Sequence, residues 1–339
     1  MKKKMKLSRN GKLALQITCG FCLALVMIPM LFAMALSALT VDEVELSEDV
    51  DGADFASKVK HSEKYEDSAF YITVYRTESG VFESIAFERY IVGVVAAEMP
   101  ALFELEALKA QAVAARTYAM RILEHEDYIL DSVMHQVFLD DDQLKLRWGD
   151  DFDRHFATIE RAVNETRGIV ITYENQLITP MFFAMSSGAT ENSEDVFGAS
   201  RPYLRSVISD GYEHRDDFAV DEVFTIEELR MAFDDMALTK DCFSILTYSQ
   251  GGNVMEMAVG SRILSGRDVR EILRLRSAAF RVDKDASWIT FTTYGHGHGV
   301  GMSQHGANIR AQNGYSYEEI LQHFYQSVAL VDRFSLHGE

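Results

Sequence analysis

Short apolar runs alternate with longer helix-forming segments along most of this 339-residue chain. A β-branched and aromatic run at 70–75, a glycine at Gly80 and a second run at 83–87 predict an opening β-hairpin. The segment 106–125 lacks glycine and proline and is dense in alanine, leucine, methionine, arginine and lysine, so it predicts a long helix. Because its alanines leave little side-chain bulk, we expect this helix to be central and buried.

The later part of the chain mixes strand and helix signals in the same way. Two apolar runs meet at Glu174-Asn175 and predict another hairpin. Three further apolar segments, at 243–248, 254–259 and 288–293, predict strands. The interleaving of these signals excludes an all-helical or all-strand fold.

Two helix starts carry a specific signature. Thr225 with Glu228, and Ser316 with Glu319, have the spacing of a capping box, in which each side chain bonds the other residue's backbone N–H. We therefore predict that residues 69–335 form a mixed α/β (α+β) domain, called the ectodomain below, with a long central alanine-rich helix and strand hairpins. The sequence contains no internal repeat or low-complexity tract.

The first 68 residues follow a different pattern, with a basic start, an uncharged run and an acidic segment. The uncharged run exceeds the roughly 20 residues that span a bilayer, whereas a cleaved signal peptide uses only about 7 to 15. Length therefore favours a retained anchor, although Ala33-Met34-Ala35 has the small-x-small form of a cleavage site. The predicted parts are a basic cytoplasmic tail at 1–12, a single transmembrane helix at 13–41, an acidic tether at 42–68 and one ectodomain at 69–335.

The charges orient the chain and limit its partners. A basic segment before the span and an acidic one after it predict that the ectodomain lies outside the cytoplasm and that the N-terminal helix contacts membrane lipid. Six of the 33 basic residues lie in 1–12, which leaves 27 against 52 acidic residues for the rest of the chain. This balance argues against nucleic acid as a partner, because a phosphate backbone selects basic surfaces.

Cysteine is scarce. Cys19 and Cys22 fall in the predicted anchor, which leaves Cys242 as the only cysteine of the ectodomain. Neither an internal disulfide nor a cysteine-rich zinc site can form there. We expect Cys242 to be a small buried apolar side chain, because free cysteine is commonly buried.

The most unusual segment is "GHGHGVGMSQHG" at 295–306, with five glycines and three histidines in twelve residues. It lacks the third glycine of a dinucleotide fingerprint and the Gly-Lys of a P-loop, so it does not predict a phosphate site. His296 and His298 would share one side of an extended strand, and His305 could add a third nitrogen to a zinc site. Alternatively, the glycines let a polymer lie close to the backbone.

A second dense segment places a carboxylate at the end of an apolar run. Glu98 follows 91–97 and precedes Met99-Pro100, where a helix must stop or kink. An acid among apolar neighbours has a raised pKa, which suits a proton donor, but a solvated glutamate at a helix end fits the same composition.

Long blocks of the chain closely resemble the signatures of the stage II sporulation protein D family and its relatives among the amidase enhancers. The blocks are "YIVGVVAAEMPALFELEALKAQAVAARTYA" at 90–119, "HQVF" at 135–138, "FFAMSSGATENSEDVFG" at 182–198, "PYLRSV" at 202–207 and "GHGHGVGMSQHGANIRAQNGYSYEEILQHFY" at 295–325. They occur in the family's order, and the resemblance covers about residues 70–334.

The resemblance implies a lytic transglycosylase that cuts peptidoglycan glycan strands after an amidase has removed their peptides. The catalytic glutamate of the family's E-M-P block maps to Glu98, and no cofactor is implied. A hydrolase deploys two carboxylates, whereas a lytic transglycosylase can use one, because the 6-hydroxyl of muramic acid attacks the anomeric carbon. We expect the glycine-histidine loop to line a glycan groove facing Glu98.

Polar residues of the family blocks are the candidate sugar contacts, and the same residues could instead hold the loop on the long helix. These candidates are Arg116, Tyr118, Ser186, Ser187, His298, Ser303, Gln304 and His305. Some family members carry cysteine and histidine zinc ligands in the region of 125–145, but this chain has only His125 and His135 there, so we predict no metal. Ala189 also departs from the family, where a glycine follows Ser-Ser-Gly.

By resemblance, the expected setting is engulfment during sporulation, in the mother-cell membrane with the C-terminal domain facing the septal space. The expected partners are the glycan strands and the stage II sporulation proteins P, an amidase, and M, a membrane protein. The alternative function is a non-catalytic glycan-binding module that stimulates a cell-wall amidase.

Overall fold

The structure is a computed structural model that describes residues 60–61, 70–285 and 287–333. The predicted cytoplasmic tail and membrane anchor, and nearly all of the acidic tether, lie outside these residues. Within the described part of the chain, no helix has both the length and the apolar character needed to cross a bilayer.

The opening hairpin is present where the sequence predicts it. Strands β2 (Tyr71–Arg76) and β3 (Val81–Ala86) pair antiparallel over their whole length. Two short strands extend this sheet to the order β1-β3-β2-β4, with β1 (Lys60–His61) on β3 and β4 (Ile129–Leu130) on β2. The pairing of β4 with β2 brings the chain that follows the long helix back beside the hairpin.

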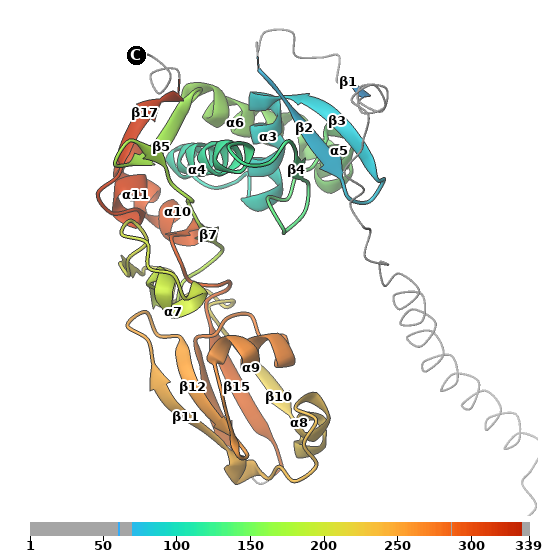
Figure 1. Cartoon of the computed structure of the whole chain (residues 1–339), viewed down its shortest axis with the longest axis vertical. Coiled ribbons are helices and arrows are strands. Elements are labelled where there is room, and N and C mark those ends of the chain that lie inside the picture. The colour runs from blue at the N-terminus through green and yellow to red at the C-terminus, as the bar shows by residue number, and fades with distance from the viewer. Residues whose placement is uncertain (1–59, 62–69, 286, 334–339) are drawn as a thin grey trace, which may run out of the picture. The chain divides into compact units, whose positions relative to one another are not determined.

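The predicted long helix is α4 (Leu105–Leu123), and it is central as expected. Figure 1 shows α3 (Phe87–Glu98), α6 (Phe152–Glu165), α10 (Gln304–Gln312) and α11 (Tyr317–Phe324) gathered around it. Its alanines divide between two apolar cores, one with α3 and α6 and one with α10 and α11. Small side chains therefore allow helices to pack on more than one face of α4.

The second predicted hairpin forms with a tight turn. Strands β5 (Ile169–Tyr173) and β6 (Gln176–Leu177) are joined by Glu174 and Asn175, which have φ angles of 49° and 62°. Positive φ at both central residues is the geometry of a hairpin turn. The C-terminal strand β17 (Ala329–Asp332) pairs with the other edge of β5.

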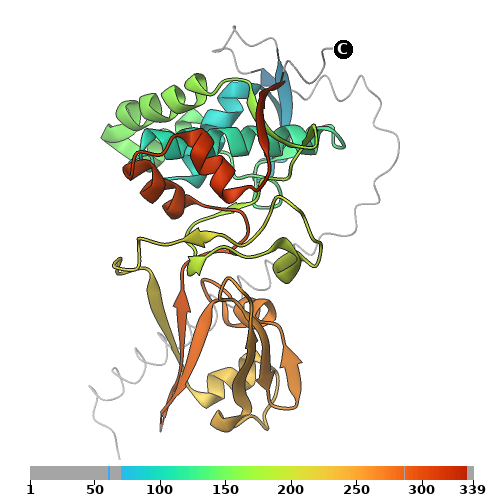
Figure 2. The same ribbon diagram turned by 90° about the vertical axis from the view of Figure 1, so that its left-hand side faces the viewer.

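Residues 219–294 form a β-rich part with its own apolar core. One sheet has the order β10-β15-β14, and the other has the order β11-β12-β13. Figure 2 shows the strands of this part in yellow to orange. The elements are β10 (Ala219–Phe224), α8 (Ile226–Ala232), β11 (Phe243–Tyr248), β12 (Val254–Val259), β13 (Arg262–Leu264), α9 (Gly266–Leu273), β14 (Phe280–Lys284) and β15 (Ile289–Tyr294). The three predicted strands are therefore confirmed within one residue.

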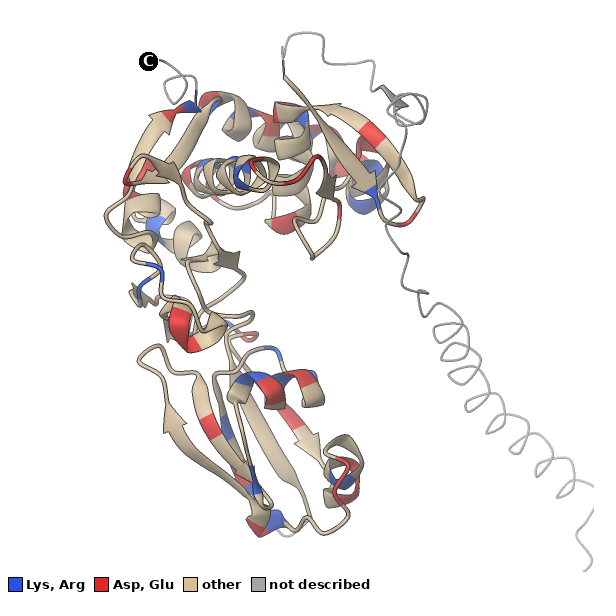
Figure 3. Ribbon diagram, viewed as in Figure 1, with Lys and Arg blue, Asp and Glu red and all other residues tan. Residues whose placement is uncertain are grey.

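Both predicted capping boxes are confirmed, at the starts of α8 and α11. The remaining elements are short: α5 (Asp141–Trp148), η1 (Gly149–Asp151), β7 (Phe182–Phe183), β8 (Gly188–Ala189), α7 (Ser193–Phe197), β9 (Ile208–Ser209), η2 (Lys240–Cys242) and β16 (Met302–Ser303). The fold is thus a mixed α/β arrangement with several small sheets. Acidic and basic residues are interspersed over its helices and strands (Figure 3).

The prediction that Cys242 is buried is wrong. Its side chain is partly exposed at the edge of the β-rich core. The sulfur lies 3.3 Å from both the backbone nitrogen and the hydroxyl of Thr239, and these hydrogen bonds lower the pKa of the thiol. The end of a 3-10 helix keeps this cysteine at the surface.

Candidate active site

Glu98 is the last residue of α3, as the sequence predicts. The helix stops there because Met99 is extended and Pro100 follows. The guanidinium of Arg147 donates hydrogen bonds of 3.1 and 3.0 Å to the carbonyls of Ala96 and Ala97, which fixes the end of the helix. The carboxyl group is thereby held on a rigid element.

The surroundings of Glu98 favour its protonated form. Burial raises the pKa of the Glu98 carboxyl, and this effect outweighs the backbone N–H of Val137 and the charge of Arg147, which lower the pKa. The Val137 N–H donates to Oε1 at 3.1 Å. Within the described part of the chain, Oε2 has no hydrogen-bond partner, so one oxygen can meet a ligand.

Glu98 lines a cavity of about 320 Å³. Its walls come from the ends of α3 and α4, the loop after β4, the segment before β7 and the glycine-histidine loop. The lining residues are Glu98, Tyr118, Val133, His135, Gln136, Val137, Pro180, Met181, Phe182 and His298. Glu98 is the only carboxylate in this lining. The cavity therefore combines one acid with an aromatic hydroxyl, imidazoles and apolar side chains.

Two of the predicted substrate-binding residues, Tyr118 and His298, do line this cavity. Burial raises the pKa of Tyr118, and among the described residues its hydroxyl has no hydrogen-bond partner, so the neutral phenol is free to bond a ligand. The cavity thus brings together residues from four of the sequence blocks, at 90–119, 135–138, 182–198 and 295–325.

His298 is engaged by the protein on both sides of its ring. Nδ1 accepts the backbone N–H of Val300 at 3.1 Å, which leaves the proton on Nε2, 3.1 Å from the carbonyl of Phe182. Burial lowers the pKa of this imidazole to about 4. A neutral histidine with both ring nitrogens bonded holds the loop against the first residue of β7.

The low pKa of His298 predicts a loss of stability in mild acid. The unfolded imidazole has a pKa of about 6.5, so its contribution to stability is complete above that pH and is lost as pH falls toward about 4. The thermal midpoint should therefore drop between pH 7 and pH 4, and His298→Ala should flatten that dependence although it lowers stability at pH 7. An identical pH dependence in both proteins would contradict this role.

The glycines of the loop do not leave space for a polymer, contrary to one of our expectations. A Cβ at Gly295 would lie 2.4 Å from the carbonyl oxygen of Met185, and one at Gly301 would lie 2.0 Å from that of Met181. Both glycines also have positive φ angles, of 69° and 81°. They are required because the loop packs against the protein's own chain at 181–191.

Arg116 is not brought to the cavity. Its side chain is fully buried, and its guanidinium forms an ion pair with Glu88 at 2.7 Å. Further hydrogen bonds reach the carbonyls of Ile169 and Val163. This arginine links α3, α4 and α6 in the interior.

Ser186 and Ser187 lie apart from Glu98 as well. The buried hydroxyl of Ser186 donates to the carbonyl of Ser209 at 2.7 Å and contacts the hydroxyl of Tyr212. Ser187 lines a separate cavity of about 470 Å³ whose other walls are mainly aromatic, and its hydroxyl donates to the carbonyl of Gly251 at 3.0 Å.

Ser303, Gln304 and His305 form the start of α10. The Ser303 hydroxyl caps the helix by accepting the N–H of Gly306, and Gln304 is buried. The ring of His305 contacts Phe103 edge-on at 5.0 Å, and burial lowers its pKa to about 4. None of the three lines the Glu98 cavity, so their sugar-binding roles stay predictions.

The zinc alternative finds no support at the loop. The bonded ring nitrogens of His298 leave it no lone pair for a metal, and His296 is exposed. Among the described residues, no group of three or more potential ligands is close enough to hold a metal ion. Metal independence stays a prediction.

Some contributors to the cavity were not singled out from the sequence. Val137 bonds Glu98 through its backbone N–H, which any residue but proline could supply. Arg147 bonds carbonyl groups at the end of α3. The side-chain type therefore does not reveal the role of either residue. Gln136 lines the cavity with a buried Nε2 that lacks a partner within the described residues. The available signal is the block "HQVF" at 135–138, which the sequence identifies only as a family motif.

Comparisons with known proteins agree with the sequence blocks. The family model described as stage II sporulation protein matches residues 75–173. Stage II sporulation protein D of Bacillus amyloliquefaciens is 36% identical over 319 residues, which cover 91% of this chain and 93% of that protein. The protein of the same name from Bacillus subtilis (strain 168) is 37% identical over 280 residues, or 80% and 82% of the two chains.

The chain belongs to the stage II sporulation protein D family. A protein named amidase enhancer, from Bacillus subtilis (strain 168), is 27% identical over 298 residues, which cover 70% of this chain and 40% of that protein. The matched family segment 75–173 contains Glu98, α4 and the loop after β4, which together form most of the cavity.

Proposed function

We propose that this member of the stage II sporulation protein D family is a membrane-anchored lytic transglycosylase that cleaves peptide-stripped peptidoglycan strands. The supporting observation is a cavity with a single carboxylate, Glu98, whose pKa is raised by burial. In most glycoside hydrolases a second carboxylate activates water or acts as the nucleophile. The lining supplies none, whereas a lytic mechanism needs only one acid.

In the proposed mechanism, the protonated Glu98 gives its proton to the glycosidic oxygen, and the bond from that oxygen to the anomeric carbon of muramic acid breaks. The 6-hydroxyl oxygen of the same sugar then bonds to the anomeric carbon and gives its proton to the Glu98 carboxylate. The products are a strand with a new free hydroxyl and a 1,6-anhydro-muramic acid end. Glu98 returns to its protonated state, so the cycle balances without water.

The setting of the proposal follows the family. The uncharged run at 13–41 would anchor the chain in the mother-cell membrane, with the C-terminal domain outside the cytoplasm during engulfment. Stage II sporulation protein P would supply stripped strands as the amidase, and stage II sporulation protein M would be the membrane partner.

A non-catalytic glycan-binding role that stimulates an amidase is the second candidate, because a relative carries the name amidase enhancer. The purified full-length protein, incubated alone with peptide-stripped glycan strands, separates the two. We expect the strands to shorten, as seen by size-exclusion chromatography. Strands that are bound but keep their length would favour the stimulating role.

A further inference from the structure

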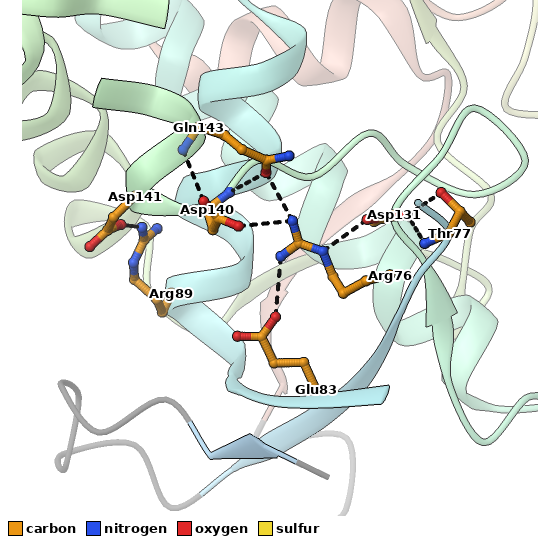
Figure 4. Close-up of polar contacts among 8 residues, drawn as sticks. All are labelled: Arg76, Thr77, Glu83, Arg89, Asp131, Asp140, Asp141 and Gln143. Carbon is orange, nitrogen blue, oxygen red and sulfur yellow. Dashed lines mark hydrogen bonds and ion pairs between the residues drawn. The ribbon is translucent and has the colours of Figure 1, made fainter. Parts of the chain in front are cut away.

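Arg76 bonds both ends of the loop 131–140, whose middle part contacts Glu98. Arg76, the last residue of β2, donates from Nε to Asp131 at 2.9 Å and from Nη2 to Asp140 at 2.9 Å (Figure 4). Asp131 follows β4, and Asp140 is the N-cap of α5. The loop between these two carboxylates contributes Val133, His135, Gln136 and Val137 to the cavity.

The same guanidinium has two further partners. Nη1 pairs with Glu83 of β3 at 3.2 Å, and Nη2 also donates to Gln143 at 2.9 Å. Gln143 in turn completes the capping box of Asp140. The Arg76 side chain is only 12% exposed. A planar fork that bonds four partners in distinct directions is a geometry that lysine cannot reproduce.

Phe138, near the end of the loop, packs against α3. The Arg76 guanidinium lies 5.0 Å from the centre of the Phe138 ring, which stacks on Tyr90 at 5.3 Å. Gly93 makes room for this ring, since a Cβ there would lie 2.3 Å from Phe138. The loop therefore sits on the helix that ends in Glu98, and its Val137 N–H meets the carboxylate.

We propose that Arg76 is a positioning residue for Glu98, which acts by holding the loop 131–140 in place. The assignment rests on the proposed function for its effect on cleavage, but its effect on the Glu98 carboxyl does not depend on that function. Three carboxylates, Glu83, Asp131 and Asp140, converge on Arg76. Without the guanidinium they repel one another, and the loop ends separate.

The expected consequence is a change in the acidity of Glu98. The Val137 N–H lowers the pKa of this carboxyl, so its loss raises that pKa further. A general acid works in its protonated form, so the high-pH limb of the cleavage profile moves to higher pH. A variant that is only partly unfolded would cleave more slowly at every pH, and the high-pH limb of its profile would not move.

Arg76→Lys in the full-length protein tests the proposal, because a single ammonium keeps the charge but cannot bridge Asp131 and Asp140 as the fork does. The pKa of Glu98 is measured by carbon NMR of labelled glutamate carboxyls, and Glu98→Gln assigns the signal. We expect a rise of about one pH unit, the effect of one lost hydrogen bond to a carboxylate, with a matching shift of the cleavage profile. Arg154→Lys, in an exposed pair with Asp151, is the matched control and should leave both unchanged.

Each result has a defined meaning. An unchanged Glu98 pKa in folded Arg76→Lys overturns the positioning role, whatever happens to activity. A raised pKa in a protein whose parent cleaves no glycan upholds the positioning role and overturns the proposed function. If Arg76→Lys does not fold, Asp140→Asn can replace it, because this change weakens only the contact between Arg76 and residue 140. The Glu98 pKa measured in that variant then tests the positioning role in the same way.

Discussion

Glu98→Gln is expected to lower the rate of glycan cleavage by about 10²- to 10⁴-fold, because positioned proton transfer supplies a factor of that size. The amide keeps the shape of the side chain and can accept the Val137 N–H, but it has no proton of suitable acidity. The rate would be measured as new strand ends formed by the full-length protein on peptide-stripped glycans.

Binding and stability should survive in the same variant. The thermal midpoint of Glu98→Gln should match that of the parent, since a desolvated carboxyl is replaced by a neutral group of equal size. Glu78→Gln is the matched control, because Glu78 is exposed in the turn between β2 and β3. Full cleavage by Glu98→Gln would exclude Glu98 as the acid.

Arg116→Leu is expected to destabilise the fold by about 3–5 kcal/mol, the cost of leaving one partner of a buried ion pair alone. The fully buried guanidinium holds Glu88 with three hydrogen bonds, and its loss leaves that carboxylate in the interior. Chemical denaturation of the two proteins gives the difference in the free energy of unfolding.

Two further variants sharpen this test. Arg154→Ala removes an arginine from an exposed pair and should change stability by less than about 0.5 kcal/mol. The double variant Glu88→Leu with Arg116→Leu should recover much of the loss, because the Glu88 carboxylate is then no longer left in the interior without Arg116. A stable Arg116→Leu that no longer binds glycan would instead restore the sugar-contact role predicted from the sequence.

Local patterns predicted much of the fold. The hairpin at 70–87, the helix α4 and the two capping boxes depend on residues close in sequence, so their composition specified them. The position of Glu98 at a helix end followed from the proline two residues later. The apolar run before it allowed two interpretations, a buried acid with a raised pKa and a solvated glutamate, and the structure supports the first.

The site was predicted less completely, because its contacts join distant segments. Arg116 and Ser186 were candidate sugar contacts, since an arginine and a serine in a family block look alike whether buried or exposed. The glycines of the loop proved to face the protein's own backbone at 181–191. The bridge from Arg76 to Asp140 spans 64 residues and has no local signature.

The most direct test of the central claim is the mass of the strand ends that the full-length protein releases from peptide-stripped glycans. A lytic transglycosylase with Glu98 as its single acid makes ends in 1,6-anhydro-muramic acid, each lighter by one water than a hydrolytic end. The account predicts these anhydro ends from the parent protein and their loss in Glu98→Gln. Reducing ends from the parent protein would contradict it and would require a second carboxylate to activate water.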